Sequence, residues 1–124
     1  MKYMTIVKGK ESYGFPPQEL FDAIDELGKE ATENGTMLQT GGLLPTQVLG
    51  VSVRIDDGEI TVTDGPYSEA KEVVGGFAIF EFNSKEEAVE AAVRFMELHR
   101  KYWPEWEGET EVRQMGEAPE DYQA

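Results

Sequence analysis

The chain contains no cysteine, a single histidine and few basic residues. Without cysteine it has no disulfide, no thiolate nucleophile and no cysteine-ligated metal. Its 11 lysines and arginines stand against 25 aspartates and glutamates, which gives a formal net charge of −14. Phosphate backbones and anionic membranes repel such a surface, so we expect no direct binding of nucleic acid or membrane.

Long apolar runs are also missing. No stretch of 18 apolar residues occurs, and the short apolar run that follows Met1 is too weak for a signal peptide. We therefore expect a cytoplasmic protein. A length of 124 residues predicts one domain with a single core, which we place at residues 1–116, followed by a polar tail at residues 117–124.

Signatures of metal and nucleotide binding are lacking as well. With one histidine, only carboxylates remain as metal ligands, and the acids do not follow the spacing of a calcium loop. The pairs Gly41-Gly42 and Gly75-Gly76 do not open a helix after a strand, as a nucleotide-binding glycine triplet does. The sequence therefore predicts no metal and no cofactor.

The apolar residues that are present predict two helices and six strands. Helical spacing runs from Pro17 to Asn34 and from Ser84 to about His99 or Arg100, and Ser84 with Glu87 forms the pattern of a capping box. Strands are expected at residues 3–8, 36–44, 48–55, 59–63, 77–82 and 110–115. The third and fourth of these form a β-hairpin around the turn at residues 56–58.

This order predicts an α+β, ferredoxin-like fold: two β-α-β units with a central β-hairpin insertion and both helices on one face of an antiparallel sheet. The second face of the sheet is then without helices. Because the run from Phe77 to Phe82 carries phenylalanine on both of its faces, the uncovered side would expose a large apolar surface. We therefore expect a homodimer that buries this surface and leaves a cleft beside it.

The segment from Asp64 to Phe77 places charged and hydroxyl side chains between two predicted strands. An aspartate before Gly65-Pro66 is typical of a turn, in which the carboxylate orders the loop. Held beside these two residues, the Asp64 carboxylate is also a candidate catalytic or ligand-binding group, with Lys71 or Arg113 setting its charge state. The sequence leaves both interpretations open.

Other candidate groups have two readings each. Arg54 and Arg113 either clamp an anionic ligand through the guanidinium fork or form surface ion pairs. His99 is either an acid-base group or a favourable cation near the carboxyl end of the second helix. Trp103 and Trp106 either cover a pocket or dimer edge or pack within the chain.

Five pieces of the sequence can be read together: Met1-Lys2-Tyr3-Met4, the run from Val62 to Tyr67, Lys71-Glu72 followed by Gly75-Gly76-Phe77, the helix start at Ser84, and Glu111-Val112-Arg113. In this order and spacing they resemble the DGPF family, a branch of the YCII-related proteins. The resemblance spans about residues 1–116, with Tyr67 standing where that family most often has phenylalanine. It implies a dimeric α/β barrel and little defined biochemistry.

Some YCII-related proteins resemble small enzymes with a histidine and aspartate pair, in which the histidine lies on the first helix. No histidine occurs between Pro17 and Asn34, so this pair is not carried over. We predict a small-molecule cleft near Asp64, and Asp64 is the candidate catalytic residue. The candidate ligand-binding residues are Arg54, Tyr67, Lys71, Glu72 and Arg113.

Three functions are compatible with these observations. The first is a homodimeric DGPF-type protein that binds a small organic ligand. The second is a cofactor-independent lyase or isomerase that acts on an oxygenated organic substrate, by analogy with related dimeric barrels. The third is an accessory protein of a sigma-factor transcription system, because the resembling proteins are often encoded beside extracytoplasmic-function sigma factors.

Overall fold

The structure, a computed structural model, describes residues 1–65 and 72–123. Its strands are β1 (Lys2–Gly9), β2 (Met37–Gly42), β3 (Val51–Asp56), β4 (Glu59–Asp64), β5 (Val73–Glu81) and β6 (Gly108–Gln114). Its helices are α1 (Gln18–Glu33) and α2 (Lys85–Tyr102), with 3-10 turns at Glu11–Tyr13 and Pro119–Tyr122. Neither α-helix of these described ranges is long and apolar enough to cross a membrane.

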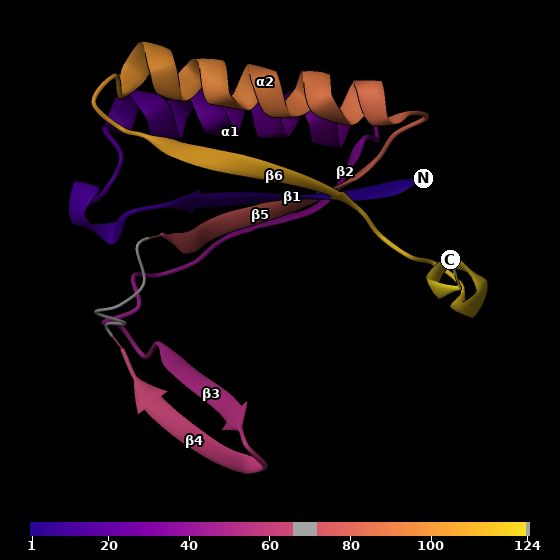
Figure 1. Cartoon of the computed structure of the whole chain (residues 1–124). Coiled ribbons are helices and arrows are strands. Elements are labelled where there is room, and N and C mark those ends of the chain that lie inside the picture. Colours follow the sequence, from indigo (N-terminus) through magenta and orange to yellow (C-terminus); the bar gives the residue numbers. More distant parts are fainter. Residues whose placement is uncertain (66–71, 124) are drawn as a thin grey trace.

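The main sheet has four antiparallel strands in the order β2-β5-β1-β6. The central strand β1 pairs with both β5 and β6, so Tyr3 lies opposite Phe80 on one side and Gln114 on the other. Both helices lie on the same face of this sheet (Figure 1). The predicted α+β fold, with its ferredoxin-like order and a separate hairpin, is confirmed.

The core lies between this sheet and the helices. Tyr3, Ala78 and Phe80 are buried on the helix side, and Ala88 of α2 packs against them with no exposed surface. Leu20 of α1 is also completely buried. Burial of one such large apolar side chain stabilises the fold by roughly 1.5–3 kcal/mol, so these few positions contribute strongly to stability.

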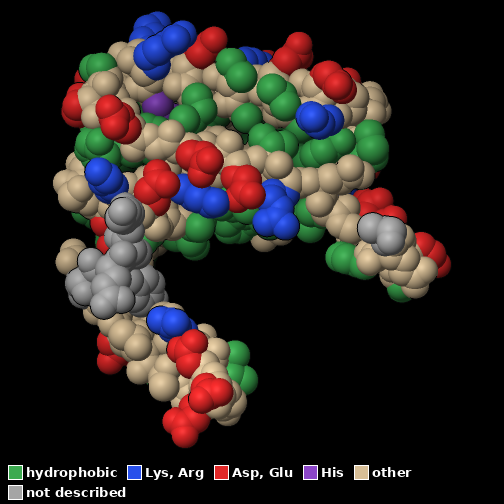
Figure 2. Space-filling view, viewed as in Figure 1, with side chains coloured by type: hydrophobic (Ala, Val, Ile, Leu, Met, Phe, Trp, Pro, Cys, Tyr) green, Lys and Arg blue, Asp and Glu red, His purple; other side chains and the backbone are tan. Residues whose placement is uncertain are grey.

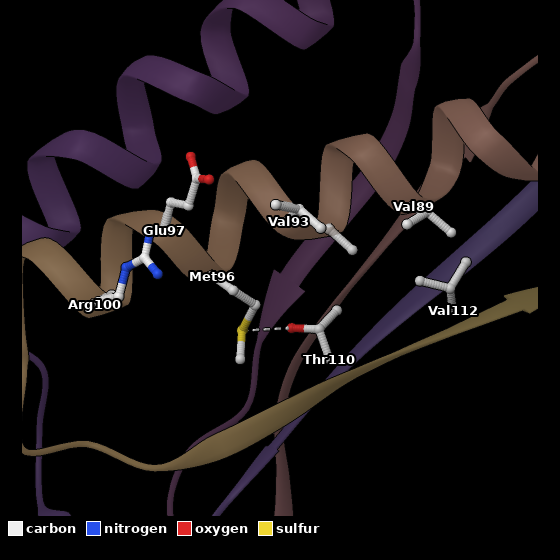
Figure 3. Close-up of a pocket in the computed structure, with 8 residues that line it drawn as sticks. Val89, Val93, Met96, Glu97, Arg100, Thr110 and Val112 are labelled. Carbon is white, nitrogen blue, oxygen red and sulfur yellow. Dashed lines mark hydrogen bonds between the residues drawn. The ribbon is translucent and has the colours of Figure 1, made fainter.

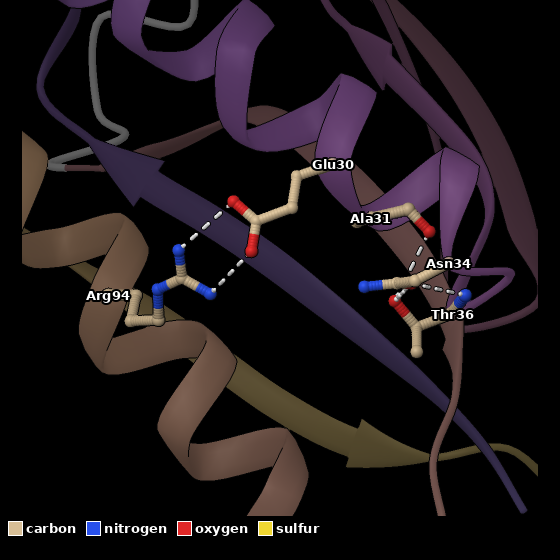
Figure 4. Close-up of polar contacts among 5 residues, drawn as sticks. All are labelled: Glu30, Ala31, Asn34, Thr36 and Arg94. Atoms are coloured by element: carbon tan, nitrogen blue, oxygen red, sulfur yellow. Dashed lines mark hydrogen bonds and ion pairs between the residues drawn. The ribbon is translucent and has the colours of Figure 1, made fainter.

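The helix α1 begins and ends where the sequence predicts. Pro17 precedes it in an extended conformation, and Gly35 follows it with a φ of 80°, a left-handed value that glycine adopts without strain. After the helix, the Thr36 amide and hydroxyl both donate to Asn34 Oδ1, at 3.0 and 2.7 Å (Figure 4). These bonds hold the turn after α1, and β2 begins at the next residue, Met37.

The helix α2 has half of the predicted capping box. The Glu87 amide donates to Ser84 Oγ at 3.2 Å, whereas the Glu87 carboxylate accepts from the amide of Asn83 and not from that of Ser84. The helix continues to Tyr102, beyond the predicted end near Arg100, because the amide of the buried Trp103 donates to the His99 carbonyl at 2.8 Å.

The two helices are joined on their exposed side by an ion pair. Arg94 of α2 donates to both carboxylate oxygens of Glu30 of α1, at 3.5 and 3.4 Å (Figure 4). Both side chains are more than half exposed. Solvent screening reduces the contribution of such a pair, so the buried apolar contacts hold the helices in place.

The predicted hairpin is confirmed as a two-stranded sheet of its own, β3-β4. Val53 pairs with Val62 and Ile55 with Ile60, and the turn has positive φ values at Asp57 and Gly58. Figure 1 shows the hairpin projecting away from the main sheet, on the side opposite the helices.

The expectation about Phe77 to Phe82 was only partly right. Phe80 and Phe82 are buried on the helix side, and Phe77 alone of these phenylalanines lies on the uncovered face, where it is half-buried. The strand β5 alternates its side chains, and Phe82 follows the strand and turns into the core. Among the described residues, the hairpin exposes more apolar surface than this run does.

Candidate functional site

The sheet face without helices, here called the open face, is apolar on one half and charged on the other. It is formed by Met4, Ile6 and Lys8 of β1, Phe77 and Ile79 of β5, and Glu109, Glu111 and Arg113 of β6. Strand alternation places these residues together, because residues directly opposite in an antiparallel pair share a face. The apolar half lies on β5 and β1, and the charged half follows β6.

The apolar half depends on a close approach between Phe77 and Gly41. These residues are paired across β2 and β5, and a Cβ added to Gly41 would lie 2.9 Å from the Phe77 ring. The ring therefore packs closely against Gly41, where a side chain would collide with it. With Ile6 and Ile79 beside it, it forms a continuous apolar surface.

The charged half is a set of ion pairs around Lys8. Its Nζ lies 2.7 Å from Glu111 Oε1 and 3.9 Å from Glu109, and Arg113 lies 3.8 Å from the second Glu111 oxygen. The bond to Glu111 raises the pKa of Lys8, and the nearby Glu72 carboxylate adds to this. The same bond lowers the pKa of Glu111. Figure 2 shows acidic and basic side chains gathered over β6.

The structure brings together some of the residues predicted for a site and separates others. Arg113 and Glu72 lie near Lys8 at the open face. Arg54 lies on the projecting hairpin, where it pairs with Asp56 at 3.2 Å, so the two arginines do not form one clamp within a chain. Tyr67 and Lys71 lie outside the described residues, as do the other residues from 66 to 71.

Asp64 is exposed at the end of β4, opposite Val51. The following residue closes the base of the hairpin, because the Gly65 amide donates to the Gly50 carbonyl at 2.7 Å. A Cβ on Gly65 would collide with the Thr46 carbonyl, so this position requires glycine. The role of Asp64 as a ligand or catalytic group stays a prediction.

His99 lies in the last turn of α2, near its carboxyl end as the sequence predicts, but its side chain is buried and this disfavours the cation. Its ring lies 4.7 Å from those of Phe95 and Trp106, and Nδ1 is 3.0 Å from the Phe95 carbonyl. Burial lowers the pKa of His99, so the imidazole is neutral at pH 7 and serves packing.

The two tryptophans pack within the chain. Their rings are stacked with centroids 6.0 Å apart, and Trp103 is 6% exposed. The Trp106 ring covers Gly9 and Gly108, which are paired at the ends of β1 and β6, and a Cβ at either glycine would press on it. Of the two readings of this aromatic loop, the structure supports intramolecular packing.

A groove of about 540 Å³ lies between α2 and the edge strand β6 (Figure 3). Val89, Val93 and Met96 line it from the helix, and Thr110 and Val112 line it from the strand. Thr110 Oγ1 lies 3.1 Å from Met96 Sδ across the groove. Glu97 and Arg100 of α2 also line the groove, which is open and otherwise mainly apolar, so it offers chiefly packing surface.

Lys8, Glu109 and Glu111 are absent from the residues predicted as a site. The available signal was the alternation along residues 2–8 and 108–114, which puts every second residue on one face. Pairing of the first strand with the last cannot be read from either segment alone. In the described ranges, no three carboxylate or histidine groups are arranged to hold a metal ion.

Comparison with known proteins agrees with this architecture. The family model of the YCII-related domain, which describes sequence, matches residues 1–96. These residues run from β1 into α2 and include the hairpin. The chain matches no curated relative. The match covers 96 of the 124 residues and leaves β6, with its Glu109, Glu111 and Arg113, outside it. The chain belongs to the YCII-related domain family.

Proposed function

We propose that this chain, as a member of the DGPF branch, forms a homodimer that binds a small oxygenated organic molecule over the open face. The observation that carries the proposal is the Lys8 and Glu111 pair, set directly beside the apolar surface of Ile6 and Phe77. Ligand sites commonly combine an apolar lining with a few convergent polar groups that fix orientation. The open face has both elements.

A second copy supplies the enclosure that the open face needs. In the single chain no helix lies over this face (Figure 1). Packing two sheets face to face buries apolar residues such as Ile79 and leaves room at the charged margin. A homodimer therefore explains both why the face is apolar at its centre and why charges line its edge.

The charges favour a neutral, hydroxylated ligand. The groups Lys8 and Arg113 are outnumbered by three carboxylates, those of Glu72, Glu109 and Glu111, so an anion would meet net repulsion. A hydroxyl group can accept from an ammonium and donate to a carboxylate at the same time. A phenol or an alcohol on an apolar ring satisfies this arrangement.

The pKa directions support binding over proton transfer. The pKa of Lys8 is raised and that of Glu111 is lowered, so both groups keep their charges near pH 7. General acid-base catalysis requires a group whose pKa lies close to the working pH. The lyase or isomerase function, and the sigma-factor accessory function, gain no comparable support from the site.

A ligand screen by thermal shift tests the proposal. We expect hydroxylated aromatic compounds to raise the melting temperature of the wild type and matched aromatic carboxylates to have no effect. Lys8→Met should abolish the shift, while Lys2→Met, at the opposite end of the same strand, should retain it. No stabilisation by any compound, or equal stabilisation of both lysine variants, would refute binding at this site.

A further inference from the structure

We propose that the hairpin β3-β4 is an intersubunit arm, whose apolar face docks on the open face of a second copy of this chain. This inference rests on the homodimer proposed above and specifies the contact that forms it. The arm is defined here as residues 51–64. Each copy would then give one arm and receive one.

The arm has one apolar face and one polar face. Register places Val51, Val53, Ile55, Ile60 and Val62 on the same side of the two strands. Their exposed fractions run from 48% to 70%, so this face is uncovered in the single chain. The opposite side carries Ser52, Arg54, Thr61 and Thr63. This division is typical of a sheet that is solvated on one side and packed on the other.

An isolated arm of this kind lacks the support that a stable sheet requires. A two-stranded hairpin is at best marginally stable in water, and stability comes from further strands or from packing on another surface. The arm forms a sheet separate from the four main strands, and Figure 1 shows it extending away from them. Its β-branched residues suit a pleated surface that is covered on one face.

The open face of a second copy offers a matching surface. On its apolar half, Met4 and Ile79 are paired and partly exposed, whereas Ile6 and Phe77 line the proposed ligand site beside Lys8. The arm of the same chain points away from this face (Figure 1), so we assign Met4 and Ile79 to the arm of a second copy. The arm projects on the side of the sheet that bears the open face. A copy seated against that face is therefore within reach of the arm, and two-fold symmetry makes the contact twice.

Charge opposes contact of two copies less at this place than elsewhere on the surface. Each chain has a formal net charge of −14, so two copies repel one another over most of their surface. The apolar face of the arm carries a single charged side chain, Asp64 at its base, opposite Val51. A basic foreign protein would be attracted to the acidic surfaces elsewhere. Arm and open face are where two acidic copies meet with least repulsion.

Sedimentation of matched arm variants tests the inference. We expect the wild type at twice 13.9 kDa. Val53→Asp on the apolar face should weaken the dimer about tenfold or more, and Thr61→Asp on the polar face of the arm should weaken it about threefold or less. Circular dichroism and tryptophan fluorescence confirm that each variant stays folded, since both tryptophans lie outside the arm.

The outcomes separate this inference from the homodimer itself. A wild type that sediments at 13.9 kDa refutes both. A dimer that survives Val53→Asp but dissociates with Ile79→Asp on the open face keeps the homodimer and overturns the arm. Equal weakening by Val53→Asp and Thr61→Asp also overturns it, because charge alone would then explain the effect.

Cross-linking provides a second measurement, because the chain has no cysteine of its own. Val62→Cys and Ile79→Cys are made in separate proteins, subunits are exchanged by mixing, and the mixture is oxidised. The mixed disulfide should form in Val62→Cys with Ile79→Cys and fail to form in Thr63→Cys with Ile79→Cys. Equal yields from both mixtures, or none from either, would contradict docking of the apolar face.

Discussion

Lys8 and Glu111 are diagonal neighbours on adjacent strands, with Nζ 2.7 Å from Oε1, although Lys8 is directly paired with Glu109. The lysine therefore reaches past its opposite neighbour to the next residue on the same face. The Lys8 ammonium therefore lies beside Glu111, the residue directly opposite Ile6. The relationship makes Lys8 the centre of the charged half of the open face.

Removal of Lys8 should change the titration of Glu111. The ammonium lowers the pKa of Glu111, chiefly through their hydrogen bond, so Lys8→Met should move this pKa up towards its ordinary 4.5. A carboxyl group whose pKa is lowered in the folded state stabilises the fold at pH values above its unfolded pKa. This stability is lost as pH falls through the folded pKa. Lys8→Met should therefore lose less stability in acid than the wild type does. Carboxyl-carbon NMR titration measures the shift, and Lys2→Met should leave it unaltered. An unchanged Glu111 pKa in Lys8→Met would contradict the pairing.

His99 should make stability sensitive to mild acid. Burial lowers its pKa below the ordinary 6.5, so the folded state favours the neutral ring. The unfolded state binds the proton first, and stability is therefore fully present above about pH 6.5 and is lost as pH falls through the folded pKa. We expect the melting temperature of the wild type to fall between pH 7.5 and 5.5 by more than that of His99→Phe. Equal falls in both proteins would argue against a neutral, buried histidine.

Substitution by alanine should destabilise the fold at one glycine of the main sheet and have little effect at another. A Cβ at Gly108 would collide with the Trp106 ring and the Lys8 carbonyl, while a Cβ at Gly42 meets nothing within 4 Å. Gly108→Ala should cost about 1–3 kcal/mol, as overpacking does, and shift tryptophan fluorescence. Gly42→Ala should have little effect on either quantity. Denaturant unfolding followed by fluorescence compares them, and a neutral Gly108→Ala would mean that Trp106 does not cover this glycine.

The neighbours Leu20 and Phe21 test where the core lies. Leu20 is completely buried, whereas Phe21 is 44% exposed on the next position of α1. Leu20→Ala should destabilise the fold by about 2–5 kcal/mol through lost burial and a cavity. Phe21→Ala should cost about 1 kcal/mol or less. Urea denaturation provides both values, and similar losses would show that α1 is rotated relative to the packing described above.

Local pattern predicted the elements well because each depends on residues close in sequence. The spacing from Leu20 to Ala31 fixed the first helix, and Asp56-Asp57-Gly58 fixed the hairpin turn. The end of α2 was missed, since the bond between Trp103 and His99 depends on aromatic packing with Trp106. Packing of that kind joins a helix to a loop and has no short-range signal.

The candidate site was less predictable. Arg113 and Glu72 were identified from their charge and their position on or beside strands, but Lys8 and Glu111 were not. The contact between Lys8 and Glu111 joins residues that are 103 positions apart in the sequence. Arg54 was chosen for the same chemistry as Arg113, yet it belongs to a separate two-stranded sheet. Residue type alone cannot distinguish these cases, because strand pairing decides which charges meet.

By itself, the sequence determined the α+β class, the two amphipathic helices, the hairpin and the acidic surface. These follow from periodicity, turn chemistry and charge, which act over short distances or as sums over the chain. Only the tertiary structure decided that His99 is a neutral core residue, that Lys8 and Glu111 meet, and that the hairpin stands apart with its apolar face uncovered. Burial and long-range strand register set those features, and both exist only once distant segments have packed together.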